Sequence, residues 1–210
     1  MMRRFTYILI ATTLLSGLLL ACEPETGNEP IPEEPIPEQP TPEQPTPEEP
    51  QLPENPLSTL DGDVEVQFSA DDSLSYADCF GNYYDTNSYM WGLYFQNYTS
   101  KEQIYIEIMD QDYLFEIPLG TYTASDDINA VGVLIKGCID VDGYQAYSWY
   151  TRLGTESQSA ATAPIFGGSI TIEEADEDVF KVTFDLIDDG ANKIYGVYEG
   201  RMILEDFRIN

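Results

Sequence analysis

The sequence predicts an all-β domain, and two observations support this prediction. From Leu57 onward no segment shows the 3.6-residue apolar period of an amphipathic helix, whereas apolar and polar residues alternate repeatedly. Short clusters of Asp, Asn and Gly separate the alternating segments, and these are the residues that tight hairpin turns require. About ten short strands joined by turns are therefore expected.

The expected strands follow one another closely along residues 57–210. In the first of them, Val64, Val66 and Phe68 alternate with polar residues. In chain order the strands cover residues 64–68, 88–97, 104–108, 113–117, 131–135, 147–151, 170–172, 180–186, 194–198 and 202–207. The segment 152–164, rich in Ser, Thr, Ala and Gly, is expected to be a loop. These strands suit an antiparallel β-sandwich of about 8–10 strands or, alternatively, a closed barrel of the lipocalin or calycin kind, and alternation does not distinguish the two.

The first 21 residues predict an export signal. Arg3 and Arg4 precede an apolar run of 16 residues, 5–20. That run is shorter than the roughly 20 residues of a membrane-spanning helix and has the length of a signal-peptide core. Residues 1–21 are therefore expected to be removed from the mature chain.

The end of this segment, Leu19-Leu20-Ala21-Cys22, resembles the bacterial lipobox. The resemblance implies that Cys22 is diacylated, becomes the new N-terminus and anchors the chain in a membrane. The acidic residues that begin at Glu23 resemble the surface-export signal of Bacteroidetes lipoproteins. This second resemblance implies an outer-membrane lipoprotein that faces the cell surface, with a periplasm-facing protein as the alternative.

Residues 22–56 predict a disordered stalk between the anchor and the domain. Twelve of the chain's 14 prolines lie in residues 24–56, and from Pro30 they form the repeats PIPEE, PIPEQ, PTPEQ and PTPEE. Proline fixes φ and lacks an amide donor, which excludes helix and sheet. An extended polyproline II conformation, with a reach of roughly 100 Å, is expected instead. Ten acidic residues with no basic one add self-repulsion to the stalk.

Residues 167–202, together with the earlier segment LGTYTASDD at 119–127, resemble a recurrent domain of unknown function in Bacteroidetes lipoproteins. The shared pattern is an alternating strand that ends in Phe-x-Leu-x-Asp, followed by Gly-x-Tyr-x-Gly, and it covers about a third of the folded part of the chain. The resemblance implies an all-β exported domain, and the alternating pattern places that domain at residues 57–210. The resemblance implies no activity.

Charge and composition exclude several classes of function. Residues 57–210 contain 28 acidic and 7 basic residues, a net charge of −21. Such a surface repels nucleic-acid phosphates and anionic lipid, so no nucleic-acid partner is expected. The chain contains no His, which excludes Ser–His and Cys–His nucleophile pairs and most zinc sites.

Two cysteines remain once Cys22 is assigned to the lipid. Cys79 and Cys138 form an even pair in a protein expected to reside in an oxidising compartment, so a disulfide between them is expected. Its loop of about 60 residues would stabilise the fold by at most roughly 4 kcal/mol. Two buried free thiols are the alternative.

Two acidic pairs, Asp140 with Asp142 and Asp188 with Asp189, offer the hard oxygen ligands that calcium takes. Neither matches the spacing of an EF-hand loop, and Asp near Gly is also what hairpin turns require. Turns are the preferred interpretation, with a calcium site as the alternative and no other cofactor expected. Paired carboxylates could serve a glycosidase, but no motif singles out one pair, so an enzyme is not expected.

Aromatic residues provide the candidate binding surface. Nine of the 23 residues from 76 to 98 are aromatic, and a second group lies between 144 and 150. Exposed Tyr and Trp beside carboxylates and amides suit sugar rings, so Tyr83, Tyr84, Trp91 and Trp149 are the candidate ligand-binding residues, with core packing as the alternative.

These observations favour a non-catalytic, lipid-anchored envelope or surface lipoprotein whose β-domain binds an extracellular ligand such as a glycan. The first alternative is an adhesin-like structural subunit that meets an envelope protein through a long uncharged strand edge. The second is a hydrolase, which would show two convergent acids in a pocket, one of them with a raised pKa.

Overall fold

The structure, a computed structural model, describes residues 51–69, 73–111, 115–156 and 158–208. The expected signal peptide (1–21), the lipid-bearing Cys22 and the stalk up to residue 50 lie outside the described residues. Within the described part all regular structure is β, which confirms the predicted fold class. No helix in these residues is long and apolar enough to span a membrane.

The described residues form thirteen strands, of which three are only two or three residues long. Their bounds are β1 Val64–Ser69, β2 Ser73–Gly81, β3 Tyr89–Asn97, β4 Glu102–Asp110, β5 Gly120–Ser125, β6 Val133–Ile135, β7 Cys138–Ile139, β8 Gln145–Ala146, β9 Trp149–Arg152, β10 Ala161–Asp176, β11 Val179–Asp188, β12 Lys193–Gly200 and β13 Ile203–Asp206.

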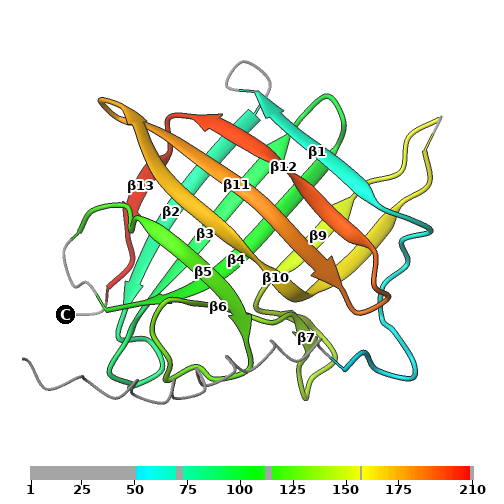
Figure 1. Ribbon diagram of the computed structural model, residues 1–210, viewed down its shortest axis with the longest axis horizontal. Helices are drawn as coiled ribbons and strands as arrows, with labels where there is room; N and C mark the ends of the chain where they lie inside the picture. The colour runs from blue at the N-terminus through cyan, green and yellow to red at the C-terminus, as the bar shows by residue number, and fades with distance from the viewer. Residues whose placement is uncertain (1–50, 70–72, 112–114, 157, 209–210) are drawn as a thin grey trace, which may run out of the picture. The chain divides into compact units, whose positions relative to one another are not determined.

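Eleven strands form one sheet. Ten of them follow the order β1-β12-β11-β10-β5-β6-β4-β3-β2-β13, and the eleventh, β9, pairs with both β10 and β4. The strands β10, β9, β4, β6 and β5 thereby form a closed ring. From that ring β11, β12 and β1 continue on one side, and β3, β2 and β13 continue on the other (Figure 1). The fold therefore combines the two packed layers of a sandwich with the closure of a barrel.

The core lies between these two layers and is built from the inward-facing side chains of their strands. On β3, Leu93 and Phe95 face inward, and on β11, Val182 and Phe184 face inward, all at most 1 % exposed. The Phe95 and Phe184 rings meet edge to face with centroids 5.1 Å apart, and Phe68 of β1 contacts both. Such aromatic contacts across the two layers fix their spacing.

The structure corrects three of the expected elements. The described residues of the expected strand 113–117 lie in no strand, and β5 begins instead at Gly120 after Pro118. Part of the expected loop 152–164 belongs to β10, which begins at Ala161. The strand β2 was not expected, because its inward residues Ser75, Ala77 and Cys79 are small while its larger side chains face outward.

The pairing is not wholly antiparallel, which also differs from the expectation. β1 runs parallel to β12, β13 runs parallel to β2, and β5 runs parallel to β6. The first two of these pairs are the sheet edges, where the chain enters and leaves the domain. An edge strand that is not joined to its neighbour by a hairpin can run either parallel or antiparallel to that neighbour.

Candidate ligand-binding site

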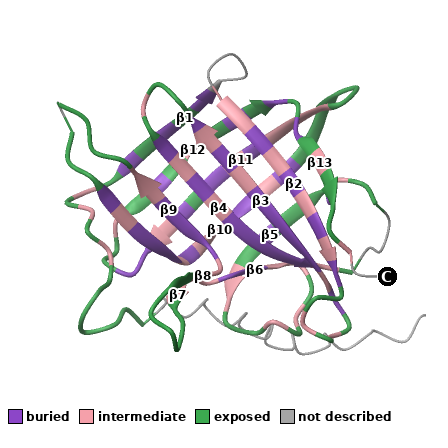
Figure 2. Cartoon of the chain, turned by 180° about the vertical axis from the view of Figure 1, so that it is seen from behind, coloured by how far each residue is buried: buried purple, intermediate pink, exposed green. Residues whose placement is uncertain are grey.

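The candidate site lies on the outer face of β4. Because side chains alternate along a strand, Ile104, Ile106 and Ile108 enter the core and Gln103, Tyr105 and Glu107 face outward. The neighbouring strands β3 and β9 flank this row, as Figure 2 shows from behind. The outer face of this layer is therefore rich in tyrosines, amides and one carboxylate.

Two segments rise above this face and turn it into a cleft of about 400 Å³. One is the loop between β2 and β3, and the other is the hairpin β7–β8 with the residues that lead into β9. The cleft is lined by Tyr83, Tyr84, Gln103, Tyr105, Glu107, Asp140, Gln145, Ala146, Tyr147, Trp149 and Thr151. This mixture of aromatic faces and a few polar groups is typical of a small-molecule site.

Glu107 lies in the cleft and is only 7 % exposed. One of its carboxylate oxygens accepts a hydrogen bond from the Tyr84 hydroxyl at 2.8 Å, and the other accepts one from the Tyr105 hydroxyl at 3.2 Å. Burial raises the pKa of Glu107, and the two hydroxyl donors partly oppose that rise. Burial, followed by the negative charge of Glu107, raises the pKa of both tyrosines, which keeps their hydroxyls protonated as donors.

Two glycines allow the close packing on which the cleft depends. A Cβ added at Gly92, opposite Glu107 on β3, would lie 2.9 Å from the Tyr105 hydroxyl oxygen, so this ring lies across β3 only because Gly92 has no side chain. A Cβ at Gly137 would lie 2.1 Å from the Ser148 carbonyl oxygen. Gly137 therefore allows the chain entering the β7–β8 hairpin to pack directly against the start of β9.

Tyr147 adopts a strained backbone at the rim of the cleft. Its φ is +65°, in the left-handed region that non-glycine residues seldom occupy. The next two residues are buried, and the Trp149 indole N–H donates to the Ala146 carbonyl at 2.8 Å, which fixes the turn. This conformation directs the Tyr147 ring towards Tyr84, with the ring centroids 6.3 Å apart. Strain of this kind concentrates at functional sites.

Three of the four sequence-predicted binding residues come together here. Tyr83, Tyr84 and Trp149 all line the cleft, although Trp149 lies more than 60 residues after the two tyrosines in the chain. Trp91 does not line it, and its assignment as a ligand-binding residue was wrong. It is an inward position of β3, 1 % exposed, where its ring stacks on Phe115 with centroids 6.3 Å apart.

Sequence reasoning missed Tyr105 and Glu107 as site residues. The alternation of β4 did place them on the outer face, where a glutamate would ordinarily be solvated. What buries Glu107 is the β2–β3 loop and the segment around Ser148, whose hydroxyl accepts the Glu107 backbone N–H at 3.1 Å. No local pattern in the sequence shows that these two distant segments pack over Glu107.

Three of the four aspartates considered for calcium, Asp140, Asp188 and Asp189, accept hydrogen bonds from backbone N–H groups. The Asp140 carboxylate accepts the backbone N–H groups of Asp142 and Tyr144 and closes the β7–β8 turn. Asp188 and Asp189 are buried. Among the described residues there is no group of three or more Asp, Glu, Cys or His side chains that could hold a metal ion.

The two buried aspartates anchor the chain where it enters the domain. Asp189 accepts the backbone N–H groups of Leu57 and Ser58 at 2.5 and 2.9 Å. Asp188 accepts the Ser58 hydroxyl and three donors from its own turn, the backbone N–H groups of Gly190 and Asn192 and the Asn192 side-chain amide. The segment that follows the expected stalk is therefore fixed to the β11–β12 turn.

The expected disulfide is not formed, and Cys79 and Cys138 are both free cysteines in the structure. The reason is their placement. Cys79 points inward from β2 into the core, whereas Cys138 belongs to the small β7–β8 sheet outside the main layers. Burial raises the pKa of both thiols.

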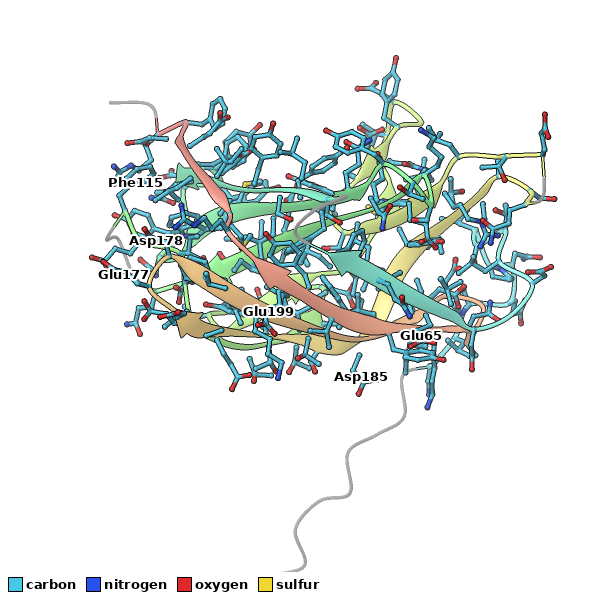
Figure 3. The ribbon with its side chains drawn as sticks, turned by 90° about the horizontal axis from the view of Figure 1, so that it is seen from above. Glu65, Phe115, Glu177, Asp178, Asp185 and Glu199 are labelled. Atoms are coloured by element: carbon cyan, nitrogen blue, oxygen red, sulfur yellow. The ribbon has the colours of Figure 1, made fainter. Side chains whose placement is uncertain are left out.

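Two other hollows lie elsewhere on the domain. One, of about 600 Å³, is lined by apolar side chains such as Phe115, Phe180 and Met202 together with three acidic residues, among them Asp178, and one arginine (Figure 3). The other, on the outer face of β11 and β12, includes Asp185, while Glu199 lies further along β12 and Glu65 lies on the neighbouring β1 (Figure 3). Neither is lined by a buried carboxylate, so the cleft over Glu107 is the stronger candidate.

Comparison with protein-family models, with curated proteins and with solved structures finds no match to this chain.

Proposed function

We propose that this protein is a non-catalytic, lipid-anchored lipoprotein of the bacterial outer membrane whose β-domain binds a glycan in the cleft over Glu107. The lipobox-like segment ending at Cys22 and the acidic, proline-rich stalk support the anchoring and a placement at the cell surface. The stalk would hold the domain away from the membrane, where soluble or neighbouring glycans are within reach.

One observation carries the proposal: rings from three separate segments converge over a single buried, hydrogen-bonded carboxylate. Tyr84 comes from the β2–β3 loop, Tyr105 from β4, and Tyr147 and Trp149 from the start of β9. Sugar rings have apolar faces that stack on aromatic side chains and hydroxyls that bond to carboxylates and amides. Gln103 and Gln145 supply such amides at the same site.

The described structure gives less support to an assembly role. Such a role predicts a long uncharged strand edge, whereas the two edge strands have six and four residues and carry Glu65, Glu205 and Asp206. Charges on short edges oppose strand addition by a partner.

A hydrolase would need a second catalytic acid beside Glu107. Asp140 also lines the cleft, but one of its oxygens holds the β7–β8 turn. Both oxygens of Glu107 are likewise engaged by tyrosine hydroxyls. We therefore propose binding without turnover, which can be checked by following any oligosaccharide that binds for release of shorter products.

The proposal is tested by applying the purified protein to a broad glycan array. Binding is expected for a restricted set of glycans, and Tyr147→Ala should reduce it at least tenfold by removing one aromatic wall. The matched control is Tyr195→Ala, which removes an exposed tyrosine from the opposite layer and should leave binding unchanged. Absence of binding to every glycan, or equal loss in both variants, would overturn the proposal.

A further inference from the structure

The cleft is acidic and its described lining contains no basic residue. Glu107 and Asp140 contribute carboxylates, and all other lining side chains are uncharged. The domain around it has a net charge of −21, which attracts cations and repels anions over several ångströms. A ligand that carries carboxylate or sulfate groups would be repelled from this site.

The tyrosines of the cleft present their rings at steep angles to one another. The Tyr83 and Tyr84 rings are 5.0 Å apart at 87°, and the Tyr84 and Tyr147 rings are 6.3 Å apart at 58°. Rings inclined in this way line the cleft with π faces in more than one orientation. The π face of an aromatic ring attracts a cation within about 6 Å of its centre.

Glu107 has no basic partner among the described residues. None of the three ion pairs in the described part of the chain involves it, and its oxygens are held only by neutral hydroxyls. A carboxylate that is nine-tenths buried is costly to keep ionised without a counter-charge. A bound cation in the cleft would supply that counter-charge.

We propose that the cleft selects glycans that carry a protonated free amine, with the ammonium group held against the tyrosine rings by Glu107. This inference rests on the proposed glycan-binding function and names the chemical class within it. Neutral sugars would stack on the same rings without the charge interaction, and uronic acids would be excluded by the two carboxylates.

The test compares three oligosaccharides of equal length by isothermal titration calorimetry near neutral pH. They are tetramers of glucosamine, N-acetylglucosamine and galacturonic acid, which differ in bearing an ammonium group, a neutral amide or a carboxylate. The glucosamine tetramer should bind at least roughly tenfold more tightly than the N-acetylated one. The galacturonic acid tetramer should show no binding.

Glu107→Gln keeps the size of the side chain and an acceptor for a tyrosine hydroxyl but removes the charge. In this variant the affinity for the glucosamine tetramer should fall to the affinity for the N-acetylated tetramer. Glu199→Gln, an exposed position in the other layer, is the control for net charge and should leave the preference intact. As a second measurement, added salt should weaken glucosamine binding to the unchanged protein more than N-acetylglucosamine binding.

The outcomes separate this inference from the proposed function. Equal binding of the amino and N-acetylated tetramers, or preferential binding of the acidic one, would overturn the amine preference and leave glycan binding standing. Failure of all three tetramers to bind, together with an empty glycan array, would overturn both.

Discussion

At the scale of single residues, Tyr147 shows how the site and the stability of the fold oppose each other. Its left-handed backbone, with φ at +65°, costs about 1–2 kcal/mol for a residue with a Cβ and almost nothing for glycine. The ring that this conformation directs into the cleft is what the proposed binding needs. The residue is thus placed for function at the expense of local stability.

We therefore expect Tyr147→Gly to be more stable than Tyr147→Ala by about 1 kcal/mol, while both lose glycan binding. Free energies of unfolding from denaturant titrations check the first part, and array binding checks the second. The reverse order of stability, with Ala above Gly, would show that the left-handed conformation is not held in solution.

Glu107 gives a pH-dependent prediction. Because its pKa is raised in the folded state, the folded protein binds this proton more tightly than the unfolded chain does. Ionisation of Glu107 therefore destabilises the fold as pH rises from the ordinary glutamate value of 4.5 through the raised one. The titratable groups that face it are Tyr84, Tyr105, Cys138, Asp140 and Tyr147.

Glu107→Gln should consequently gain stability relative to the unchanged protein as pH increases across that window, and the gain should disappear at lower pH. Urea unfolding at a series of pH values measures the difference directly. The same substitution at the exposed Glu199 controls for the change in net charge. A difference that is independent of pH would mean that the Glu107 carboxylate is solvated.

At the scale of secondary-structure elements, the sequence predicted those strands in which large apolar side chains face inward. β4 was predicted because Ile104, Ile106 and Ile108 alternate with polar residues, and all three are buried. β2 was not, since its core-facing residues are small and its large ones form the outer aromatic layer. Alternation shows which residues of a strand are apolar, but it does not show which face of the strand packs against the rest of the protein.

The same limit explains why the candidate site was only partly predicted. Aromatic density singled out Tyr83, Tyr84 and Trp149, which line the cleft, and it also singled out Trp91, which belongs to the core. Glu107 became a site residue only through a loop and a hairpin that fold over β4 from distant parts of the chain. Whether distant segments bury an outward-facing residue depends on the tertiary structure, which local sequence patterns do not show.

The anchoring of the entering segment to the β11–β12 turn can be tested on its own. Asp189→Ala removes both hydrogen bonds to the backbone of Leu57 and Ser58 and should lower the free energy of unfolding by about 1–3 kcal/mol. Amide hydrogen exchange should become faster at residues 57–60, while Asp142→Ala at the exposed β7–β8 turn should not change it. Unchanged exchange in Asp189→Ala would contradict the anchoring role.

At the scale of the whole molecule, the fold is held by its two packed layers and needs no covalent link between them. Cys79 and Cys138 are free, one in the core and the other outside the main layers. We expect an alkylating reagent to label Cys138 slowly in the folded protein, and both cysteines in denaturant without any reductant. Peptide mass spectrometry identifies the labelled sites, and labelling that appears only after reduction would show a disulfide.

The central claim is that the cleft over Glu107 is the ligand site, and a crystal structure of the protein with an array-selected oligosaccharide tests it most directly. The account predicts a sugar ring stacked on Tyr84 or Tyr147, with a polar group of the sugar within hydrogen-bond distance of the Glu107 carboxylate. A sugar bound instead in the hollow lined by Phe115 and Phe180 would contradict it.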